Sequence, residues 1–288
     1  MPRVSITHRT EYRYARPVGL GAHRVMVRPR ETRDLRLRAF DLRISPAAAV
    51  AWSHDVGGNS IATATFADMT DMLVIDVRME VELFAPEWPV FPIAASAVSY
   101  PFRYAADEVA DLGLLASPRY ADDAGQLANW VKSFVMRGST DTLSLLKDIA
   151  NGVTAQIVYE SRESEGTQGP LETLRRERGS CRDFAVLFAE AARTLGFGVR
   201  LVSGYLFDRT GDQVGSAGDG STHAWADVFV PGAGWIAFDP TNRSVGAANL
   251  VPVAVARSIE QVSPVSGSFI GTGSELLALD VKIAVQPA

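Results

Sequence analysis

Gly179-Ser180-Cys181-Arg182-Asp183-Phe184 forms the start of a predicted helix. Ser180 followed three residues later by Asp183 is the S-x-x-[DE] pattern that is typical of helix N-termini. The apolar residues that follow recur at the spacing of one helical face, and a glycine ends the run; they are Phe184, Leu187, Phe188, Ala191, Leu195 and Gly196. Cys181 therefore falls in the first helical turn, where free backbone N–H groups and the helix dipole favour an anion.

Cys181 is the single cysteine among the 288 residues of the chain. A thiol in the first turn of a helix is shifted toward the nucleophilic thiolate, although a lone free cysteine is more commonly a small buried apolar residue. One cysteine excludes an internal disulfide and a multi-cysteine zinc site. The four histidines, at positions 8, 23, 54 and 223, show no ligand spacing, so we expect neither a structural metal nor a cofactor.

His223 and Asp239 stand at the edges of two neighbouring predicted strands. His223 opens the strand 223–230 directly after a polar loop, and Asp239 ends the strand 235–239. Each has an ordinary alternative, namely a half-buried histidine and an aspartate that begins a turn. Cysteine, histidine and aspartate in this order, each at the edge of an element, nevertheless form a nucleophile–base–orienting set.

The turn between these two strands determines whether Asp239 can reach His223. A regular four-residue loop over 231–234 would place Asp239 on the face away from His223, because side chains alternate along strands. The catalytic interpretation therefore requires an odd loop or a bulge, which glycines at positions 232 and 234 make accessible. We expect one nitrogen of His223 to face Asp239 and the other to face the sulfur of Cys181.

Four blocks of the chain resemble the transglutaminase-like core of the papain-like cysteine-protease superfamily. They are Gly179–Phe184, Arg200–Tyr205, Thr222–Val228 and Gly234–Thr241. The stretch His8–Tyr14 and the tail Val253–Val285 resemble the bacterial branch of this family, so the resemblance covers most of the chain. Many relatives have Gln and His where this chain has Arg182 and Val186. Neither position belongs to the triad, which implies altered substrate contacts.

The resemblance implies a thiol enzyme in which Cys181 is the nucleophile, His223 the base and Asp239 the orienting carboxylate. The backbone N–H of Cys181 is a candidate oxyanion donor because it lies at the helix start. A second donor is needed, and the upstream candidates are Tyr159, Thr167 and Gln168. We expect hydrolysis of a peptide or isopeptide bond through a thioester. Acyl transfer to a primary amine uses the same triad, and a non-catalytic binding module on the same fold is a further alternative.

The N-terminal part of the chain predicts a β-sandwich in front of the catalytic domain, and the whole an α+β protein. Period-2 alternation runs from Val4 to Leu83, with a bulge near Ala39 and a hairpin at Asp55–Asn59. Prolines at positions 86, 89 and 92 then predict a linker. We expect a β-sandwich domain over residues 1–92 and a transglutaminase-like domain over residues 93–288.

Beyond the linker the hydrophobic period changes to that of helices. Helices are predicted over residues 106–116, 122–137 and 141–155, in addition to the one after Ser180. Three strands over 199–207, 223–230 and 235–239 follow, so helices are expected to pack on an antiparallel sheet. A final alternating strand over 277–285 is expected to return to one of the N-terminal sheets.

Charge is distributed unevenly along the chain. The net charge is −5, yet the first 43 residues carry eleven arginines against four acidic residues. An anionic partner such as nucleic acid is one interpretation, but the arginines alternate with apolar residues, which favours solvated strand faces. We therefore expect a peptide, protein or peptide-like amide substrate and no nucleic acid.

Membrane and export signals are not visible in the sequence. No apolar run approaches the roughly 20 residues that span a bilayer, and no signal peptide is recognisable after Met1. A cytoplasmic location is the expectation. The identity of the substrate and the oligomeric state are left open.

Overall fold

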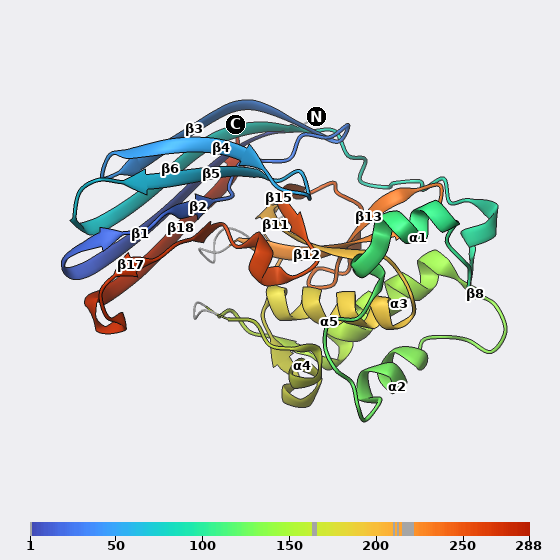
Figure 1. Ribbon diagram of the computed structural model, residues 1–288. Coiled ribbons are helices and arrows are strands. Elements are labelled where there is room, and N and C mark those ends of the chain that lie inside the picture. Colours follow the sequence, from blue (N-terminus) through green and yellow to red (C-terminus); the bar gives the residue numbers. More distant parts are fainter. Residues whose placement is uncertain (1, 163–165, 210, 212, 215–221) are drawn as a thin grey trace.

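The computed structural model describes residues 2–162, 166–209, 211, 213–214 and 222–288 (Figure 1). Parts of the two polar loops expected at 161–169 and 211–221 lie outside the described residues. A β-rich N-terminal region, blue to teal in Figure 1, is followed by a region of helices and strands. The last strand, in red, returns to the first region.

The N-terminal region contains two antiparallel sheets. In the first, β1 (Arg3–Leu20) pairs with β6 (Thr70–Leu83), which also pairs with β3 (Leu35–Ser45). The second sheet has the order β16-β2-β5-β4, with the bounds Val265–Ser266, His23–Val25, Ser60–Phe66 and Ala48–His54. The expected hairpin joins β4 to β5, with His54 opposite Ser60. The expected bulge is confirmed, since the register of β3 shifts between Leu37 and Ala39.

Alternation along β1 separates a buried face from a solvated one. Val4, Ile6 and His8 are buried, whereas Thr7 and Arg9, which alternate with them, are exposed. Rings join the two sheets: Tyr12 of β1 contacts His23 of β2. The β-rich character predicted for this region is thus confirmed.

The chain ends in the sheet in which it begins. Strand β18 (Leu276–Pro287) pairs antiparallel with β1 from Val4 to Tyr14, and the short β17 (Phe269–Ile270) pairs with the end of β1. The backbone N–H of Ala288 also donates to the carbonyl of Arg3, at 3.0 Å. The final strand therefore returns to an N-terminal sheet, as its alternation predicts. The division of the chain at residues 92 and 93 stays a prediction.

The second region is built on an antiparallel sheet with three helices on one side of it, α3 (Thr142–Gln156), α4 (Pro170–Arg176) and α5 (Cys181–Thr194) (Figure 1). Its strand order is β14-β13-β12-β11-β15, with the bounds Ser244–Val245, Gly234–Asp239, His223–Val230, Val199–Leu206 and Leu250–Ala256. Helix α5 (Cys181–Thr194) packs against β12, and Ala224, Ala226 and Phe188 belong to one hydrophobic core. The opposite face of β12, with Trp225, joins a smaller cluster. His223 and Trp225 share that face because side chains alternate.

The other helices and short strands surround this sheet. The helices are α1 (Ala106–Leu112), α2 (Gln126–Lys132), α3 (Thr142–Gln156) and α4 (Pro170–Arg176). Short 3₁₀ turns cover Ala95–Ala97, Gly113–Ala116, Ile259–Val262 and Gly273–Glu275. Two-residue strands are β7 (Ser99–Tyr100), β8 (Thr140–Asp141), β9 (Val158–Tyr159) and β10 (Arg178–Gly179). Within the described ranges, no helix combines the length and the apolar character needed to cross a membrane.

The helix predicted over 122–137 is much shorter than its periodicity suggests, covering only Gln126–Lys132. The Asp122 carboxylate accepts hydrogen bonds from the backbone of Leu127 and Ala128, so residues 122–125 form a turn that leads into the helix. Gly125, with φ 65°, stands at the junction. The hydrogen bonds of Asp122 thus explain why the helix begins only at Gln126, although the apolar spacing predicts an earlier start.

Seven of the eleven arginines in the first 43 residues form ion pairs with acidic side chains, five of them within the first sheet. Arg9 and Arg13 both bond Glu11, and Arg3 and Arg38 both bond Glu82. This pairing is what solvated strand faces require, and it neutralises much of the local positive charge.

The two regions contact each other through buried polar groups. The Nδ1 atom of His8 in β1 lies 2.9 Å from the hydroxyl of Tyr205 in β11. Asn59, in the β4–β5 turn, donates to the carbonyl of Val255 at 2.8 Å and accepts from its N–H at 2.8 Å. Arg30 in turn donates to Asn59. These bonds hold the N-terminal sheets against β11 and β15.

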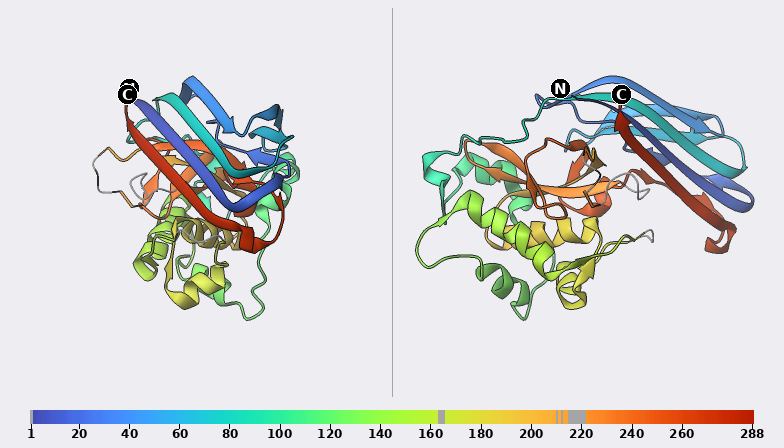
Figure 2. Two further views of the ribbon diagram at one scale, coloured as in Figure 1. Left: turned by 90° about the vertical axis from the view of Figure 1, so that its left-hand side faces the viewer. Right: turned by 180° about the vertical axis from the view of Figure 1, so that it is seen from behind.

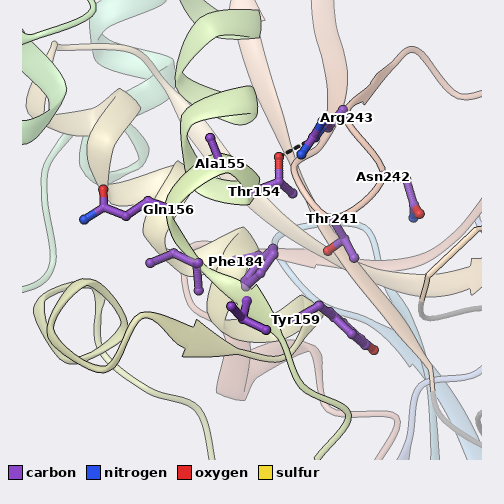
Figure 3. A pocket seen from close by; sticks show the side chains of 10 residues that line it. Thr154, Ala155, Gln156, Tyr159, Phe184, Thr241, Asn242 and Arg243 are labelled. Carbon is purple, nitrogen blue, oxygen red and sulfur yellow. Dashed lines mark hydrogen bonds between the residues drawn. The ribbon is translucent and has the colours of Figure 1, made fainter.

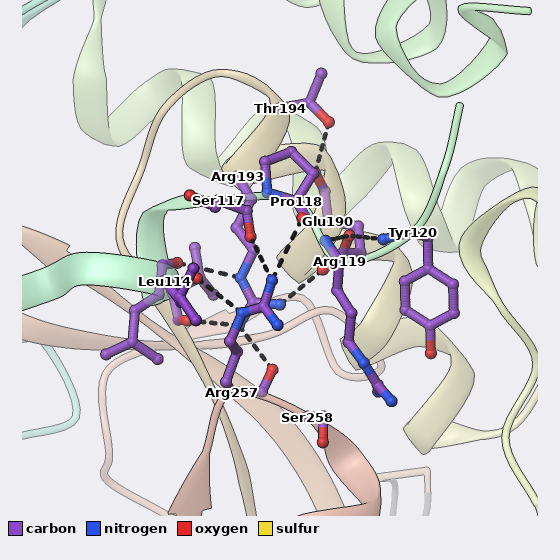
Figure 4. Close-up of polar contacts among 12 residues, drawn as sticks. Leu114, Ser117, Pro118, Arg119, Tyr120, Glu190, Arg193, Thr194, Arg257 and Ser258 are labelled. Atoms are coloured by element: carbon purple, nitrogen blue, oxygen red, sulfur yellow. Dashed lines mark hydrogen bonds and ion pairs between the residues drawn. The ribbon is translucent and has the colours of Figure 1, made fainter. Parts of the chain in front are cut away.

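A buried ion pair ties helix α5 to the loop that precedes α2 (Figure 4). Arg193 donates to Glu190 at 2.6 Å, and both side chains are almost wholly buried. Arg193 also donates to the carbonyls of Leu115, Val199 and Arg257. The other carboxylate oxygen of Glu190 accepts from the backbone N–H groups of residues 119 and 120. The two charges are therefore hydrogen-bonded as well as paired, as buried charges must be.

Candidate functional site

Cys181 is the first residue of α5 and is buried. The predicted helix start is confirmed, with Ser180 in extended conformation before it. The Asp183 carboxylate accepts from the N–H of Ser180 at 2.8 Å and from its hydroxyl at 3.0 Å. The sulfur of Cys181 thus lies at a helix N-terminus, where the unused N–H groups of the first turn stabilise negative charge.

Asp183 also holds the segment that leads into the site. It is fully buried, and its Oδ1 atom accepts from the backbone N–H of Gln168 at 2.7 Å and from Arg162 at 2.8 Å. A methyl group on Gly179 would lie 2.9 Å from the Asp183 side chain, so only glycine fits there. The sequence pattern identified Asp183 as a helix cap but not as the anchor of residues 162 and 168.

His223 and Asp239 meet as the catalytic interpretation requires. His223 Nε2 lies 2.8 Å from Asp239 Oδ2, and both side chains are buried. Val230 pairs with Gly234 and Ala226 with Phe238, so the loop contains three residues rather than four. The prediction of an odd loop is confirmed. It places Asp239 on the face of the sheet that carries His223.

The residues after Asp239 complete its hydrogen bonding. The N–H of Thr241 donates to Oδ1 at 2.9 Å, and the side-chain amide of Asn242 donates to Oδ2 at 2.8 Å. The ring of Trp225 stacks on the imidazole of His223, with 6.0 Å between ring centroids. Asn242 is a site residue that the sequence reasoning missed. Its signal is the run Asp239-Pro240-Thr241-Asn242, because an aspartate before such a turn accepts from residues two and three positions later.

The electrostatics of the pair favour an imidazolium. Burial works against the charge of His223, but the charge and hydrogen bond of Asp239, with a contribution from Cys181, raise the pKa of His223 to about 10. Burial alone would raise the pKa of Asp239, and the charge of His223 with its hydrogen bonds holds that pKa below its usual value. An Asp–His pair of this kind stays ionised near neutral pH.

The second ring nitrogen of His223 does not take part in the contact with Asp239. Nδ1 is buried and has no hydrogen-bond partner among the described residues. The Cys181 sulfur lies 4.0 Å from the carbonyl oxygen of Thr222, the residue before His223. Cys181 and His223 are thus neighbours at the end of the sheet.

The three upstream oxyanion candidates lie in different surroundings. The Gln168 amide is within 3.3 Å of both Asp183 Oδ2 and the carbonyl of Arg178. The Tyr159 ring packs edge-on against Phe184, one turn after Cys181 in α5. Thr167 is half-buried beside Gln168. The assignment of a second oxyanion donor stays a prediction.

A pocket of about 400 Å³ opens at the turn that follows Asp239 (Figure 3). Its walls come from the end of α3, from β9, from α5 and from the turn after Asp239; they include Thr154, Tyr159, Phe184, Thr241, Asn242 and Arg243. Arg243 has φ 54°, in the left-handed region, and its Nε donates to the hydroxyl of Thr154 at 2.6 Å. No carboxylate among the described residues forms an ion pair with Arg243.

Both regions of the chain match known protein families. Residues 4–82 match the bacterial transglutaminase-like N-terminal region, and residues 128–240 match the transglutaminase-like superfamily. The second match contains Cys181, His223 and Asp239.

Relatives are found along the whole chain. An uncharacterized protein of Mycobacterium tuberculosis is 29% identical over 299 residues, covering 99% of this chain and 93% of that protein. One of Mycobacterium leprae is 35% identical over 113 residues, which cover 39% of this chain and 40% of that protein. The crystal structure of a candidate cysteine protease from Cytophaga hutchinsonii covers 100% of this chain and 91% of its own, with a TM-score of 0.72 at 16% identity. The N-terminal sheets and the following region thus share one known fold.

Proposed function

The chain belongs to the bacterial transglutaminase-like family, and on this premise we propose that it hydrolyses amide bonds, peptide or isopeptide, with Cys181 as the nucleophile. The observation that carries the proposal is the buried contact of 2.8 Å between His223 and Asp239, next to a cysteine at a helix N-terminus. We also propose that the chain consists of two domains. Residues 1–92 form a β-sandwich, and residues 93–288 form a papain-like, transglutaminase-like catalytic domain.

The proposed reaction proceeds in two steps. The Cys181 thiolate attacks the carbonyl carbon, and the bond to nitrogen breaks as His223 gives its proton to the leaving amine. The acyl group then stays on sulfur as a thioester. Water attacks this thioester while His223 takes the proton back, which releases a carboxylic acid and restores the thiolate. Asp239 holds the imidazole in place and stabilises its positive charge throughout.

Negative charge on the carbonyl oxygen requires hydrogen-bond donors. The Cys181 N–H is the first donor we propose, because the N–H groups of the first helical residues have no partner within the helix. Tyr159, Thr167 and Gln168 are the proposed sources of the second donor. The side-chain amide of Gln168 already contacts Asp183. The hydrogen bond from the backbone N–H of Gln168 to Asp183 would then position the neighbouring candidate, Thr167.

The pocket at the turn that follows Asp239 is the proposed place for a side group of the substrate. Arg243 stands in its wall without a carboxylate partner among the described residues, while its Nε is fixed on Thr154. Such a cation favours an acidic substituent on the acyl part of the substrate.

Transfer of the acyl group to a primary amine is the second candidate, since the thioester accepts an amine by the same chemistry. The test incubates the protein with a fluorescent peptide library, with and without an amine-tagged acceptor, and analyses both by mass spectrometry. Hydrolysis yields new carboxyl ends, whereas transfer yields tagged products. Cys181→Ala should abolish both. Activity of Cys181→Ala within tenfold of the wild type would exclude the thiol mechanism, and a non-catalytic binding module would give neither product.

A further inference from the structure

Strand β18 forms an open border of the first sheet. One side of this twelve-residue strand pairs with β1, with a register shift at Leu277, and the other side pairs with no strand of the described ranges. The left view of Figure 2 shows this strand, in red, at the rim of the sheet beside β1. Open edges of this length are commonly protected, because their unpaired N–H and C=O groups recruit another strand.

The inward-facing row of β18 is only partly covered. Ile283 lies opposite His8 and is 7% exposed, whereas Val281 and Leu279, on the same face, are 36% and 39% exposed. Their partners in β1 belong to the buried face of that strand. Apolar side chains on the interior side of the first sheet are therefore exposed along part of β18. Such exposure is typical of a protein–protein interface.

The two charges of β18 have like charges as cross-strand neighbours in their own chain. Asp280 lies opposite Glu11, and Lys282 lies opposite Arg9. Glu11 and Arg9 are already paired with each other. Neither Asp280 nor Lys282 forms an ion pair with any described residue. Like charges directly opposite one another in a sheet are unfavourable, so these two positions lack a complement.

We propose that β18 pairs antiparallel with β18 of a second copy of this chain, about a two-fold axis through Val281. In this register Asp280 lies opposite Lys282 of the second copy, and Lys282 opposite its Asp280, so two opposite-charge pairs form. The first sheets of the two copies then become one continuous sheet. The interface is isologous, which is the usual form of a dimer with two-fold symmetry.

The charges select this register. A two-fold axis perpendicular to the sheet keeps the same face of both copies on the same side, so residues of equal parity must face each other. A shift to an axis through Asp280 would oppose two aspartates, and an axis through Lys282 would oppose two lysines. Only the axis through Val281 among these three brings opposite charges together.

The same register completes the open hydrophobic row. Leu279 comes to lie opposite Ile283 of the second copy, and Val281 opposite its own counterpart. Both partly exposed side chains thus gain apolar cross-strand neighbours on the interior side. Charge and apolar pairing, which occupy different faces of β18, favour one and the same alignment.

The first experiment measures mass by size-exclusion chromatography with light scattering over a concentration series. The wild type should be a dimer, and Asp280→Lys, which opposes lysine to lysine twice, should raise the dimer dissociation constant at least tenfold. The exchanged variant Asp280→Lys/Lys282→Asp should restore it. Asp71→Lys reverses an exposed charge in β6 of the same sheet and serves as the matched control, with no effect expected. Circular dichroism verifies that each variant is folded.

The second experiment uses disulfide trapping in a Cys181→Ala background, which removes the single native thiol. Val281→Cys places a cysteine on the two-fold axis, where Cα atoms of opposed residues are about 4.5–5.5 Å apart and within disulfide range. It should crosslink on mild oxidation, whereas Leu277→Cys, four residues away from the axis, should not. A monomeric wild type at all concentrations would overturn the proposal. So would a dimer that is indifferent to Asp280→Lys or crosslinks equally at both positions.

Discussion

His223 and Asp239 face each other at 2.8 Å because Val230 pairs with Gly234, which leaves three residues in the connecting turn. One residue more would exchange the faces of the second strand and point the carboxylate into the opposite layer. The geometry of a short turn at the far end of the hairpin therefore determines whether the histidine has a carboxylate partner.

Gly232 and Gly234 give a test of this turn. Both have positive φ, 83° and 76°, but a methyl group on Gly232 would lie 2.6 Å from backbone atoms of residues 92 and 94, whereas one on Gly234 meets nothing. We expect Gly234→Ala to cost about 1 kcal/mol from backbone strain alone. Gly232→Ala should cost clearly more and lower activity, because the turn must move. Urea denaturation checks the difference, and equal costs would contradict the close approach.

Asp239→Asn should remove the charge that keeps His223 protonated. Burial then dominates, so the pKa of His223 should fall from about 10 to below its ordinary value. Turnover should drop by roughly 10³- to 10⁴-fold, as in other enzymes whose triad carboxylate is replaced by its amide. Asn242→Ala removes only one bond to Asp239 and should cost about tenfold. Imidazole NMR titration and steady-state kinetics follow the two effects, and an unchanged histidine titration would disprove the coupling.

The stability of the protein should fall in mild acid because of His8. Burial lowers the pKa of His8 to about 4, while an unfolded histidine titrates near 6.5, so the unfolded chain binds the extra proton between these values. The free energy of unfolding should therefore decrease as pH falls from about 6.5 to 4, by up to about 3 kcal/mol. His8→Gln cannot titrate and should lose less over this range. His223 is present in both proteins, so its contribution cancels in the comparison, and parallel pH curves would refute the assignment.

Removing one partner of the buried pair at Glu190 should be costly. Arg193→Met leaves a buried carboxylate without its cation and should reduce the free energy of unfolding by about 3–5 kcal/mol. The double variant Glu190→Gln/Arg193→Met should recover part of this loss. Arg119→Ala, which breaks an exposed pair with Glu260, is the control and should cost about 1 kcal/mol or less. Equal losses in Arg193→Met and Arg119→Ala would mean that burial of the pair has no energetic weight.

Arg243→Ala should change substrate preference and leave the chemistry at sulfur intact. Two electrophilic peptides that differ only in Glu against Gln at the residue bearing the reactive carbonyl would be compared by their rate of Cys181 labelling. The wild type should prefer the Glu peptide by about tenfold, which corresponds to roughly 1.4 kcal/mol for one charge-assisted bond. The variant should lose this preference while keeping its rate with the Gln peptide. A preference that survives the substitution would assign the pocket another ligand.

Local periodicity made the elements of the site predictable. The strand His223–Val230 and the helix after Ser180 lie where alternation and the capping pattern place them, because both signals depend on neighbours in sequence. The helix predicted over 122–137 begins later than its period suggests, because the Asp122 carboxylate at the start of that range accepts from the backbone N–H groups of Leu127 and Ala128.

Long-range contacts were not predictable from one sequence. The anchoring of Gln168 by Asp183 and the contact of His8 with Tyr205, 197 positions apart, depend on how distant segments pack. The contact between His223 and Asp239 could be predicted only on the condition that the turn between the strands is odd or bulged. The sequence pattern alone does not determine how many residues an irregular loop contains. Asn242 is different, because its place three residues after Asp239 is a local signal that could have been recognised.

The pairing of β18 with β1 has a consequence for how the chain is made. A polypeptide leaves the ribosome N-terminus first, and domains generally fold as they emerge. The five strands β11 to β15 of the second region are all available once residue 256 has left the ribosome, but β1, synthesised before them, must wait for residues 276–287 to gain its second long neighbour. The edge of β1 that β18 covers thus stays unpaired until β18 has been synthesised, and during that time it can recruit other strands.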